Sequence, residues 1–345
     1  MHGCTSPVLL EKHEKHVLSK LATYNERKND RSSDVPVVCF DLENVISLPH
    51  ANVSSMFYKR KLSMYNLTGH LSCGKQAYSV LWHEGEAGRG GNDIASALTQ
   101  MLYAVVKQQP AISELILWAD SCVPQNRNSL MSLALIRFLS KQTALQKITQ
   151  KFCEPGHSSI QEVDNIHSQI ERNLRCTEVF SPLGVVRLML AVNRRKPITV
   201  LQMKTGDFME FRDTVKSLRF SDIPYSKVKV LLYSKDLPCC IKYKTSFTNT
   251  EFVNVCLLHG CNCNLHEPGK GCEFKKKFMP NVDKLKKPEL VSSGALTKQK
   301  VADIQSMYPY MPQVDREFMQ SVISAVQHHD DTTSNPSKAA TSERG

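Results

Sequence analysis

The sequence contains no long hydrophobic run. None of its apolar stretches approaches the roughly 18 residues that a helix needs to cross a bilayer. The opening residues, MHGCTSPVLL, also lack the apolar core of a secretory signal peptide. Both absences predict no membrane association and a nuclear or cytoplasmic location. The twelve cysteines are then expected in a reducing compartment, as free thiols or metal ligands rather than disulfides.

Acidic residues are the minority charge, with 33 Asp and Glu against 44 Lys and Arg, which gives a net charge of +11. A basic excess favours polyanionic partners, so nucleic acid is the expected partner, while protein partners stay unspecified. The chain also shows no internal repeat and no evident N-terminal array of DNA-binding fingers.

Hydrophobic periodicity and turn residues divide the chain into five segments. We expect residues 1–35 to form a helical arm and residues 36–250 to form an α/β domain that ends in a strand pair. Residues 251–297 are rich in Cys and Lys and are predicted to be a loop. Residues 298–327 are predicted to be a helical segment, and residues 328–345 have the composition of a disordered tail.

Within the central domain, residues 36–175 predict the element order β-β-β-α-β-α-β-α. The first strand is VPVVCFDLENV, and two more strands follow as a meander with CGKQ as the turn. Alternating helices and strands fit many α/β domains, but the opening meander narrows the choice. We therefore predict a ribonuclease-H-like mixed sheet for residues 36–250, with an α+β extension on its C-terminal side.

Two aspartates end strands that look buried. Asp41 follows VVCF, and Asp120 follows LILWA. In a ribonuclease-H-like sheet these two strands are neighbours, so both carboxylates are expected at one edge of the sheet. Neighbouring half-buried carboxylates repel each other, and a bound cation removes that repulsion. An aspartate can also simply cap the turn that follows a strand, and this alternative applies to Asp120.

The helix IQEVDNIHSQIERNLR is expected to supply a third acid. Its apolar residues, spaced three and four apart, can lie on the sheet: Val163, Ile166, Ile170 and Leu174. A second stripe, formed by Asp164, His167 and Glu171, runs along the margin of that contact. The predicted catalytic acids are therefore Asp41, Asp120, Asp164 and Glu171. The first three are the predicted ligands of Mg²⁺ or Mn²⁺, which suit phosphodiester chemistry.

Polar residues near these acids are candidate contacts for a phosphate backbone. Asn126, Arg127 and Asn128 follow Asp120, and His157 lies on a turn just before the acidic helix. Asparagines at a helix N-terminus also serve as caps, and a loop histidine is often satisfied locally, so both interpretations stay open.

The stretch CLLHGCNCNLHEPGKGC contains six soft ligands: Cys256, His259, Cys261, Cys263, His266 and Cys272. Four of them can bind one Zn²⁺ tetrahedrally, although their spacing matches no standard finger. The alternative is a basic loop with free thiols. Cys239 and Cys240 are predicted to point to opposite faces of one strand, and so not to bind one metal together without distortion.

Several stretches resemble the signature blocks of an uncharacterised domain family of animal genomes: FDLENVISLPH, FYKRKLSMYNLTGH, ADSCVPQNRN and EPGHSSIQEVDNIHSQIER. That family is associated with transposable elements and is read as a ribonuclease-H-like derivative of a transposase. The likeness spans about residues 36–245. Asp41, Asp120 and Asp164 fall on the acidic blocks of the family. The resemblance implies ancestry more than a defined activity.

The stretch FDLEN has a second interpretation. Its D-x-E spacing also occurs in four-carboxylate 3′–5′ exonucleases, where Asp41 and Glu43 would share one face of the strand. The spacing from His157 to Asp164 does not fit the rest of that pattern. Three classes of function stay open: a metal-dependent nuclease or strand-transferase, a nucleic-acid-binding or scaffold protein without catalysis, and a protein-interaction module.

Overall fold

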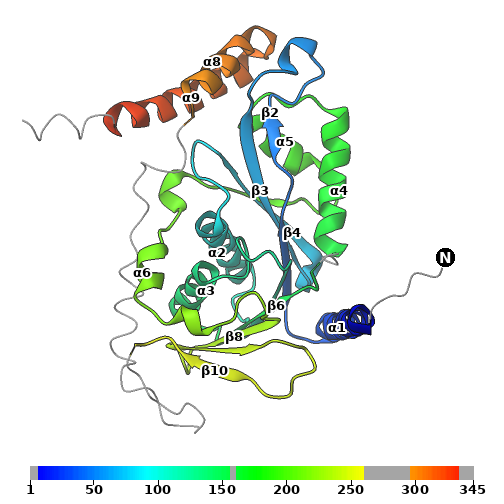
Figure 1. Cartoon of the computed structure of the whole chain (residues 1–345). Coiled ribbons are helices and arrows are strands. Elements are labelled where there is room, and N and C mark those ends of the chain that lie inside the picture. Colours follow the sequence, from blue (N-terminus) through cyan, green and yellow to red (C-terminus); the bar gives the residue numbers. More distant parts are fainter. Residues whose placement is uncertain (1–6, 156–160, 260–295, 334–345) are drawn as a thin grey trace, which may run out of the picture.

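A computed structural model shows a mixed α/β fold built around one ten-stranded sheet (Figure 1). The structure describes residues 7–155, 161–259 and 296–333. The strands are, in chain order, β1 (Val37–Leu42), β2 (Ile46–Leu48), β3 (Leu62–Leu71), β4 (Gln76–His83), β5 (Glu114–Ala119), β6 (Lys147–Phe152), β7 (Thr199–Gln202), β8 (Val230–Ser234), β9 (Cys240–Lys244) and β10 (Val253–Cys256). The helices are α1 (Pro7–Ser32), α2 (Gly91–Gln108), α3 (Ser129–Lys141), α4 (Gln161–Cys176), α5 (Pro182–Ala191), α6 (Arg212–Lys216), α8 (Lys298–Ser306) and α9 (Gln313–Thr333).

The sheet contains both parallel and antiparallel strand pairs. Its order is β10-β9-β8-β6-β5-β1-β3-β4-β7, and the short β2 pairs with β3. β3 runs antiparallel to both β1 and β4, whereas β5 runs parallel to both β1 and β6. The predicted mixed α/β fold with an opening meander followed by alternating helices and strands is therefore confirmed. The short β2 is an element that the sequence patterns did not predict.

Helices cover both faces of this sheet (Figure 1). Side chains alternate along each strand, so Val38 and Phe40 of β1 pack against α2 and α3 in the larger core. Gly69 of β3 allows α2 to approach closely, because an added Cβ there would lie 2.2 Å from the sulfur of Met101. On the opposite face, α4, α5, α8 and α9 pack over a second core that contains Ile166 and Ile170 of α4.

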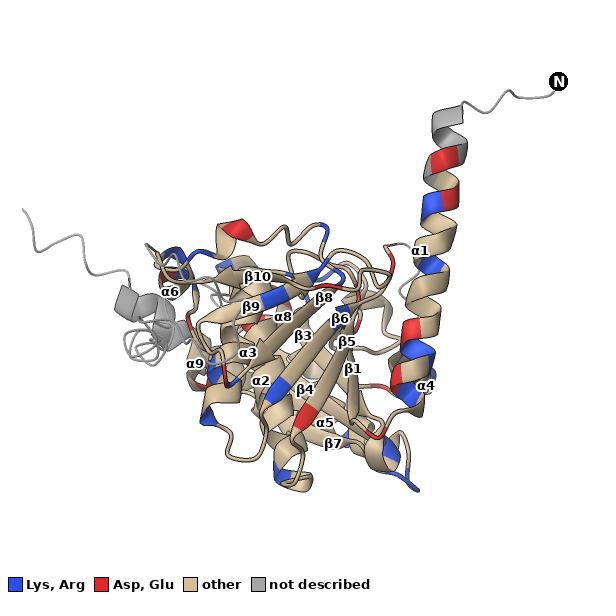
Figure 2. Ribbon diagram, turned by 90° about the horizontal axis from the view of Figure 1, so that it is seen from below, with Lys and Arg blue, Asp and Glu red and all other residues tan. Residues whose placement is uncertain are grey.

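The predicted helical arm forms α1, which is docked on the body of the protein from about its middle, where His16 and Ser19 contact Glu154, to its C-terminal end. Thr23, Arg27 and Asp30, spaced four and three apart, are buried and form one face of the helix. Arg27 and Arg31 each pair with Glu162 of α4, at 2.5 and 2.6 Å. The N-terminal part of α1 projects away from the body of the protein (Figure 2).

Two predicted segment boundaries differ from the structure. β10 lies inside residues 251–297, which were predicted to be a loop, and it extends the sheet by pairing with β9. Its four residues carry too short an alternating pattern to stand out from the surrounding Cys-rich sequence. α9 continues to Thr333, inside residues 328–345 that were predicted to be a tail.

Candidate functional site

Asp41 and Asp120 lie at the same end of two neighbouring parallel strands. Asp41 is the penultimate residue of β1, and Asp120 directly follows β5. The register pairs Cys39 with Trp118, so two residues further along each strand bring the two aspartates level. Cys39 and Trp118 belong to the apolar cluster that also contains Val163 of α4. Because side chains alternate with a period of two, both aspartates face α4.

The charge environment of Asp41 shows that other acids are close. Burial, the Asp120 carboxylate and, to a smaller extent, the Asp164 carboxylate raise the pKa of Asp41 to about 7. A hydrogen bond from the backbone N–H of Leu42, at 2.9 Å, opposes this shift. Asp41 is therefore a half-buried carboxyl group whose ionised form is disfavoured unless a positive charge compensates for it.

The Asp120 carboxylate is held by its own loop. It accepts hydrogen bonds from the side-chain amide of Asn126 and from the backbone N–H of Cys122, the latter at 3.2 Å. The backbone carbonyl of Asn126 in turn accepts a bond from the Gln150 side chain of β6, at 3.1 Å. These bonds fix the direction in which Asp120 points, and they leave its other oxygen able to accept a further ligand.

The helix α4 presents the stripes that the sequence spacing predicted. Val163, Ile166 and Ile170 are buried against the sheet. Asp164 is largely exposed. Partial removal of its carboxyl group from water raises its pKa, and the charge of Arg27 opposes that shift. Next along the stripe, burial lowers the pKa of His167 to about 4, so its ring is neutral at physiological pH.

Glu43, just after β1, forms a second acidic pair with Glu171, which lies two turns after Asp164 on α4. Burial raises the pKa of Glu43 to about 7, a hydrogen bond from Asn66 lowers it, and the charge of Glu171 raises it. Asn66 donates to one Glu43 oxygen at 2.7 Å and to the Thr68 hydroxyl at 3.0 Å. The other Glu43 oxygen is buried and has no hydrogen-bond partner in the described structure. The D-x-E spacing was the signal in the sequence that pointed to this residue.

The acids lie on one side of the sheet, but they do not form a closed cluster of three. Among described residues, no three acidic side chains have ligand oxygens within 4.8 Å of one another. Asp41, Asp120 and Asp164 are therefore more widely spaced than the ligands of a single tightly closed ion. The oxygen-only donors, the raised pKa of Asp41 and the unpaired oxygen of Glu43 nevertheless fit a hard divalent cation such as Mg²⁺ or Mn²⁺.

The polar residues after Asp120 make internal contacts. Asn126 is buried on Asp120, and the guanidinium of Arg127 donates to the Val228 carbonyl at 3.1 Å while lying over the Phe152 ring. Asn128 is the N-cap of α3, where it accepts from the backbone N–H of Met131 at 2.9 Å. Their structural contacts favour the alternative interpretation of capping and loop support over phosphate contact. His157 lies outside the described residues.

The predicted zinc ligands can be placed only in part. Cys256 ends β10, and His259 is exposed and does not join any described group of potential metal ligands. Cys261, Cys263, His266 and Cys272 lie outside the described residues. The prediction that Cys239 and Cys240 point to opposite faces of one strand is wrong, because their sulfurs are 3.7 Å apart. The strand β9 begins only at Cys240, so Cys239 belongs to the preceding turn and strand alternation does not apply to it.

The fold and the site together define a mixed α/β domain in which carboxylates gather at the C-terminal ends of two central strands, beside the helix α4. The family model of a domain of unknown function, DUF7869, matches residues 55–231, just over half of the chain. The chain therefore belongs to the DUF7869 family. The match includes Asp120, Asp164 and Glu171 but begins after Asp41. No curated protein and no solved structure matches the chain. None of the helices in the described ranges is long and apolar enough to cross a membrane.

The pKa of Asp41 predicts a pH dependence of stability. Its value is about 7 in the folded protein against an ordinary value of 3.8, so the folded state holds this proton more tightly than the unfolded state. The contribution of Asp41 to the free energy of unfolding is therefore fully present below pH 3.8 and lost as pH rises through about 7. Without divalent metal, Asp41→Asn should stabilise the protein more at pH 8 than at pH 5. The free energy of unfolding of the variant minus that of the wild type should be larger at pH 8 by roughly 2 kcal/mol.

Denaturant unfolding of wild type and Asp41→Asn in a chelating buffer measures this difference. Comparison of the two proteins at each pH removes the contributions of all other groups, including Glu43. Equal pH slopes for the two proteins would contradict the raised pKa that burial and the neighbouring acids give Asp41.

Proposed function

We propose that this protein has a ribonuclease-H-like fold of transposase ancestry and acts on phosphodiester bonds of nucleic acid with Mg²⁺ or Mn²⁺. The proposed ligands are Asp41, Asp120 and Asp164, and Glu171 is the fourth proposed catalytic acid. The observation that carries the proposal is the side-by-side position of Asp41 and Asp120 on neighbouring parallel strands, facing α4.

The order of five strands supports the fold assignment. β4-β3-β1-β5-β6 are consecutive in the sheet, and β3 runs against both of its neighbours. This is the arrangement expected of a ribonuclease-H-like sheet, with β1 in the centre carrying the first acid. The helix after the fifth of these strands is α4, and it brings Asp164 and Glu171 to the same face.

Each acid has a role that follows from its surroundings. Asp41 lies among several carboxylates, and its raised pKa makes it the group that gains most from a nearby cation. Asp120 is oriented by Asn126 and by the backbone of Cys122, which preorganises it as a ligand. Asp164 is more exposed, and its proposed role is to contact the substrate or a hydrated metal ion. Divalent ions at such a site polarise the phosphate and lower the pKa of an attacking water or hydroxyl.

Glu43 and Glu171 allow a second set of metal-binding acids, in which Glu43 joins Asp41 and Asp120. Glu171 raises the pKa of Glu43, and Glu43 has one unpaired oxygen in the described structure. A site formed by Asp41, Glu43, Asp120 and an acid of α4 would have the composition of a four-carboxylate exonuclease. Degradation from a 3′ end would favour that arrangement, whereas internal cleavage or strand transfer would favour Asp41, Asp120 and Asp164.

The alternative function is nucleic-acid binding without catalysis, and the contacts of Asp120 favour it. Its carboxylate is already stabilised by Asn126 and by a backbone N–H, so the loop does not need metal to hold its shape. Lys and Arg are distributed along α1, β9 and the surface loops rather than on one element (Figure 2). Such a protein would bind a polyanion through its net charge of +11 and leave the phosphodiester bonds intact.

Binding and cleavage assays on the full chain separate these functions. Labelled DNA and RNA, single-stranded and double-stranded, should be bound with an affinity that falls steeply as salt rises, because Lys and Arg displace counterions from phosphates. Products that appear with Mg²⁺ or Mn²⁺ and are absent with a chelator would support the proposed enzyme. Salt-dependent binding without products would support the scaffold, and no binding at low salt would exclude both in favour of a protein-interaction module.

A further inference from the structure

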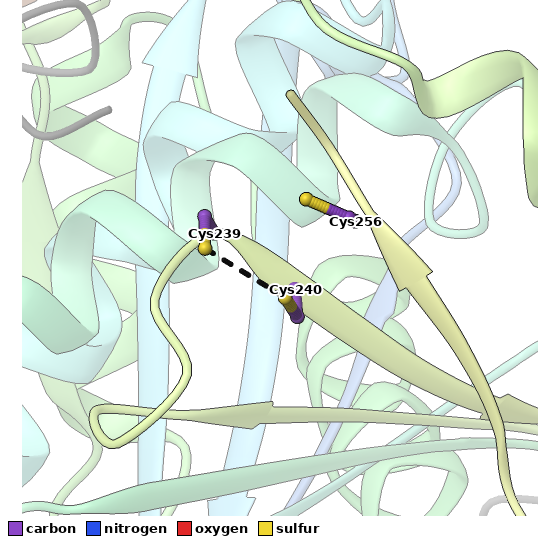
Figure 3. Close-up of side chains that lie close together, drawn as sticks. All are labelled: Cys239, Cys240 and Cys256. Carbon is purple, nitrogen blue, oxygen red and sulfur yellow. Dashed lines mark hydrogen bonds between the residues drawn. The ribbon is translucent and has the colours of Figure 1, made fainter. Parts of the chain in front are cut away.

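Three cysteines gather at the edge of the sheet that lies farthest from β7. Cys239, Cys240 and Cys256 place their three sulfurs within 4.8 Å of one another, and the Cys239 and Cys240 sulfurs are 3.7 Å apart (Figure 3). This is the one group of three potential metal ligands that the described part of the chain brings so close together. β8 and β6 separate its strands from β5, so the group is distinct from the acidic site.

Local backbone structure holds the three sulfurs together. Cys240 and Cys256 are directly paired in the antiparallel ladder between β9 and β10. Directly opposed residues in such a ladder point to the same face of the sheet. Cys239 lies in the turn before β9, and its carbonyl accepts a hydrogen bond from the backbone N–H of Leu257, at 2.8 Å. This bond ties the turn to the end of β10 and holds Cys239 beside the other two cysteines.

The spacing of the sulfurs matches that of thiolates around one metal ion. Zn²⁺ binds thiolates at about 2.3 Å in a tetrahedron, which places neighbouring sulfurs about 3.8 Å apart. The distance between Cys239 and Cys240 is 3.7 Å. All three cysteines are unoxidised in the structure, and Cys239 and Cys240 are buried while Cys256 is half-buried. The arrangement therefore needs little movement to accept an ion.

The three cysteines lie in an apolar part of the protein. Cys239 and Cys240 belong to the larger core, and Cys256 packs against it. Without a cation the three groups are packed as thiols, which are weak hydrogen-bond partners. A soft divalent ion binds thiolates and offsets two of their three charges, so binding of the ion favours loss of the thiol protons.

We propose that Cys239, Cys240 and Cys256 form a zinc site on the β9–β10 hairpin, with three thiolate ligands and the fourth position open to water. Binding of Zn²⁺ forms three Zn–S bonds and releases three S–H protons to solvent, so apparent affinity rises with pH. Cys240 also lines a cavity of about 260 Å³, together with Ser234, Lys235 and Pro238. The proposal does not depend on the proposed function.

Zinc titration of the full chain tests the site. The protein is stripped of metal under reducing conditions, and Zn²⁺ is added in competition with a chromophoric chelator. The wild type should bind one equivalent, and Cys239→Ser, Cys240→Ser or Cys256→Ser should each weaken binding by about tenfold or more. Cys73→Ser and Cys176→Ser are matched controls, because both cysteines are exposed and outside the cluster. They should bind as the wild type does.

A measurement on the unmodified chain guards against misfolded variants. Zn²⁺ should protect Cys239, Cys240 and Cys256 from alkylation, as read by peptide mass spectrometry, while Cys73 and Cys176 stay reactive. Cobalt in place of zinc should give thiolate-to-metal charge-transfer absorption that is lost in Cys256→Ser.

Three results would overturn the zinc site. The first is a wild type that binds no zinc, and the second is protection of Cys261 and Cys263 with the three cluster cysteines left reactive. The third is a disulfide between Cys239 and Cys240 that persists under reducing conditions and prevents metal binding.

Discussion

Asparagine in place of Asp120 is expected to abolish divalent metal binding and to lower metal-dependent cleavage by about 100-fold or more. Asparagine keeps the shape of the side chain and one acceptor oxygen, but it removes the charge that a hard cation requires. Asp120 also contributes to the raised pKa of Asp41. The same change should therefore bring the pKa of Asp41 closer to its ordinary value.

Asp213→Asn is the matched control for this prediction. Asp213 is an aspartate on α6 whose side chain is 85% exposed, and α6 packs beside α3 on the opposite side of the sheet. Its replacement should leave metal binding and cleavage unchanged. Cleavage that survives Asp120→Asn at the wild-type rate would show that the activity does not arise at this site.

Alanine in place of Lys151 is expected to lower the free energy of unfolding by about 3–5 kcal/mol, because it leaves a buried carboxylate without its cation. The Lys151 ammonium contacts both oxygens of Asp30 at 2.8 Å, and both residues are buried. Asp30 also accepts a bond from the Trp118 indole N–H at 2.8 Å. These contacts join α1 to β5 and β6, so the change should also detach α1.

Lys147→Ala is the control, since Lys147 lies on the same strand and pairs with Glu114 at 2.6 Å on the surface. An exposed pair of this kind contributes about 1 kcal/mol or less. Chemical denaturation measures both losses of stability, and limited proteolysis measures the release of α1. Equal, small losses for the two variants, with α1 still protected, would contradict a docked α1.

Sequence patterns predicted most of the elements because they recur with clear periods. The apolar runs VVCF and LILWA predicted β1 and β5, and the spacing of Val163, Ile166 and Ile170 predicted the buried face of α4. The aspartates at the strand ends followed from the same patterns, because strand direction and side-chain parity fix where they point.

Contacts between distant segments could not be predicted in this way. The burial of Asp30 depends on Lys151 and Trp118, which lie far along the chain, and α1 alone reads as a polar helix. The short strands β2 and β10 have three and four residues, fewer than a periodic pattern needs to be recognised.

The cysteine cluster shows a different limit. The prediction that Cys239 and Cys240 point to opposite faces was wrong because of one strand boundary. β9 begins at Cys240, and Cys239 belongs to the preceding turn. A shift of one residue at a strand end changes which side chains share a face. The surroundings of Glu43 could not be predicted from the sequence either, because its burial and its nearness to Glu171 depend on how α4 packs over the sheet.

Calorimetric titration of Mg²⁺ or Mn²⁺ into the metal-free full chain tests the central claim most directly. The wild type and Asp213→Asn should each show saturable binding that strengthens as pH rises through about 7, where Asp41 loses its proton. Asp120→Asn should show none at the same concentrations. An absence of binding by the wild type, or equal binding by wild type and Asp120→Asn, would contradict a metal site formed by Asp41, Asp120 and Asp164.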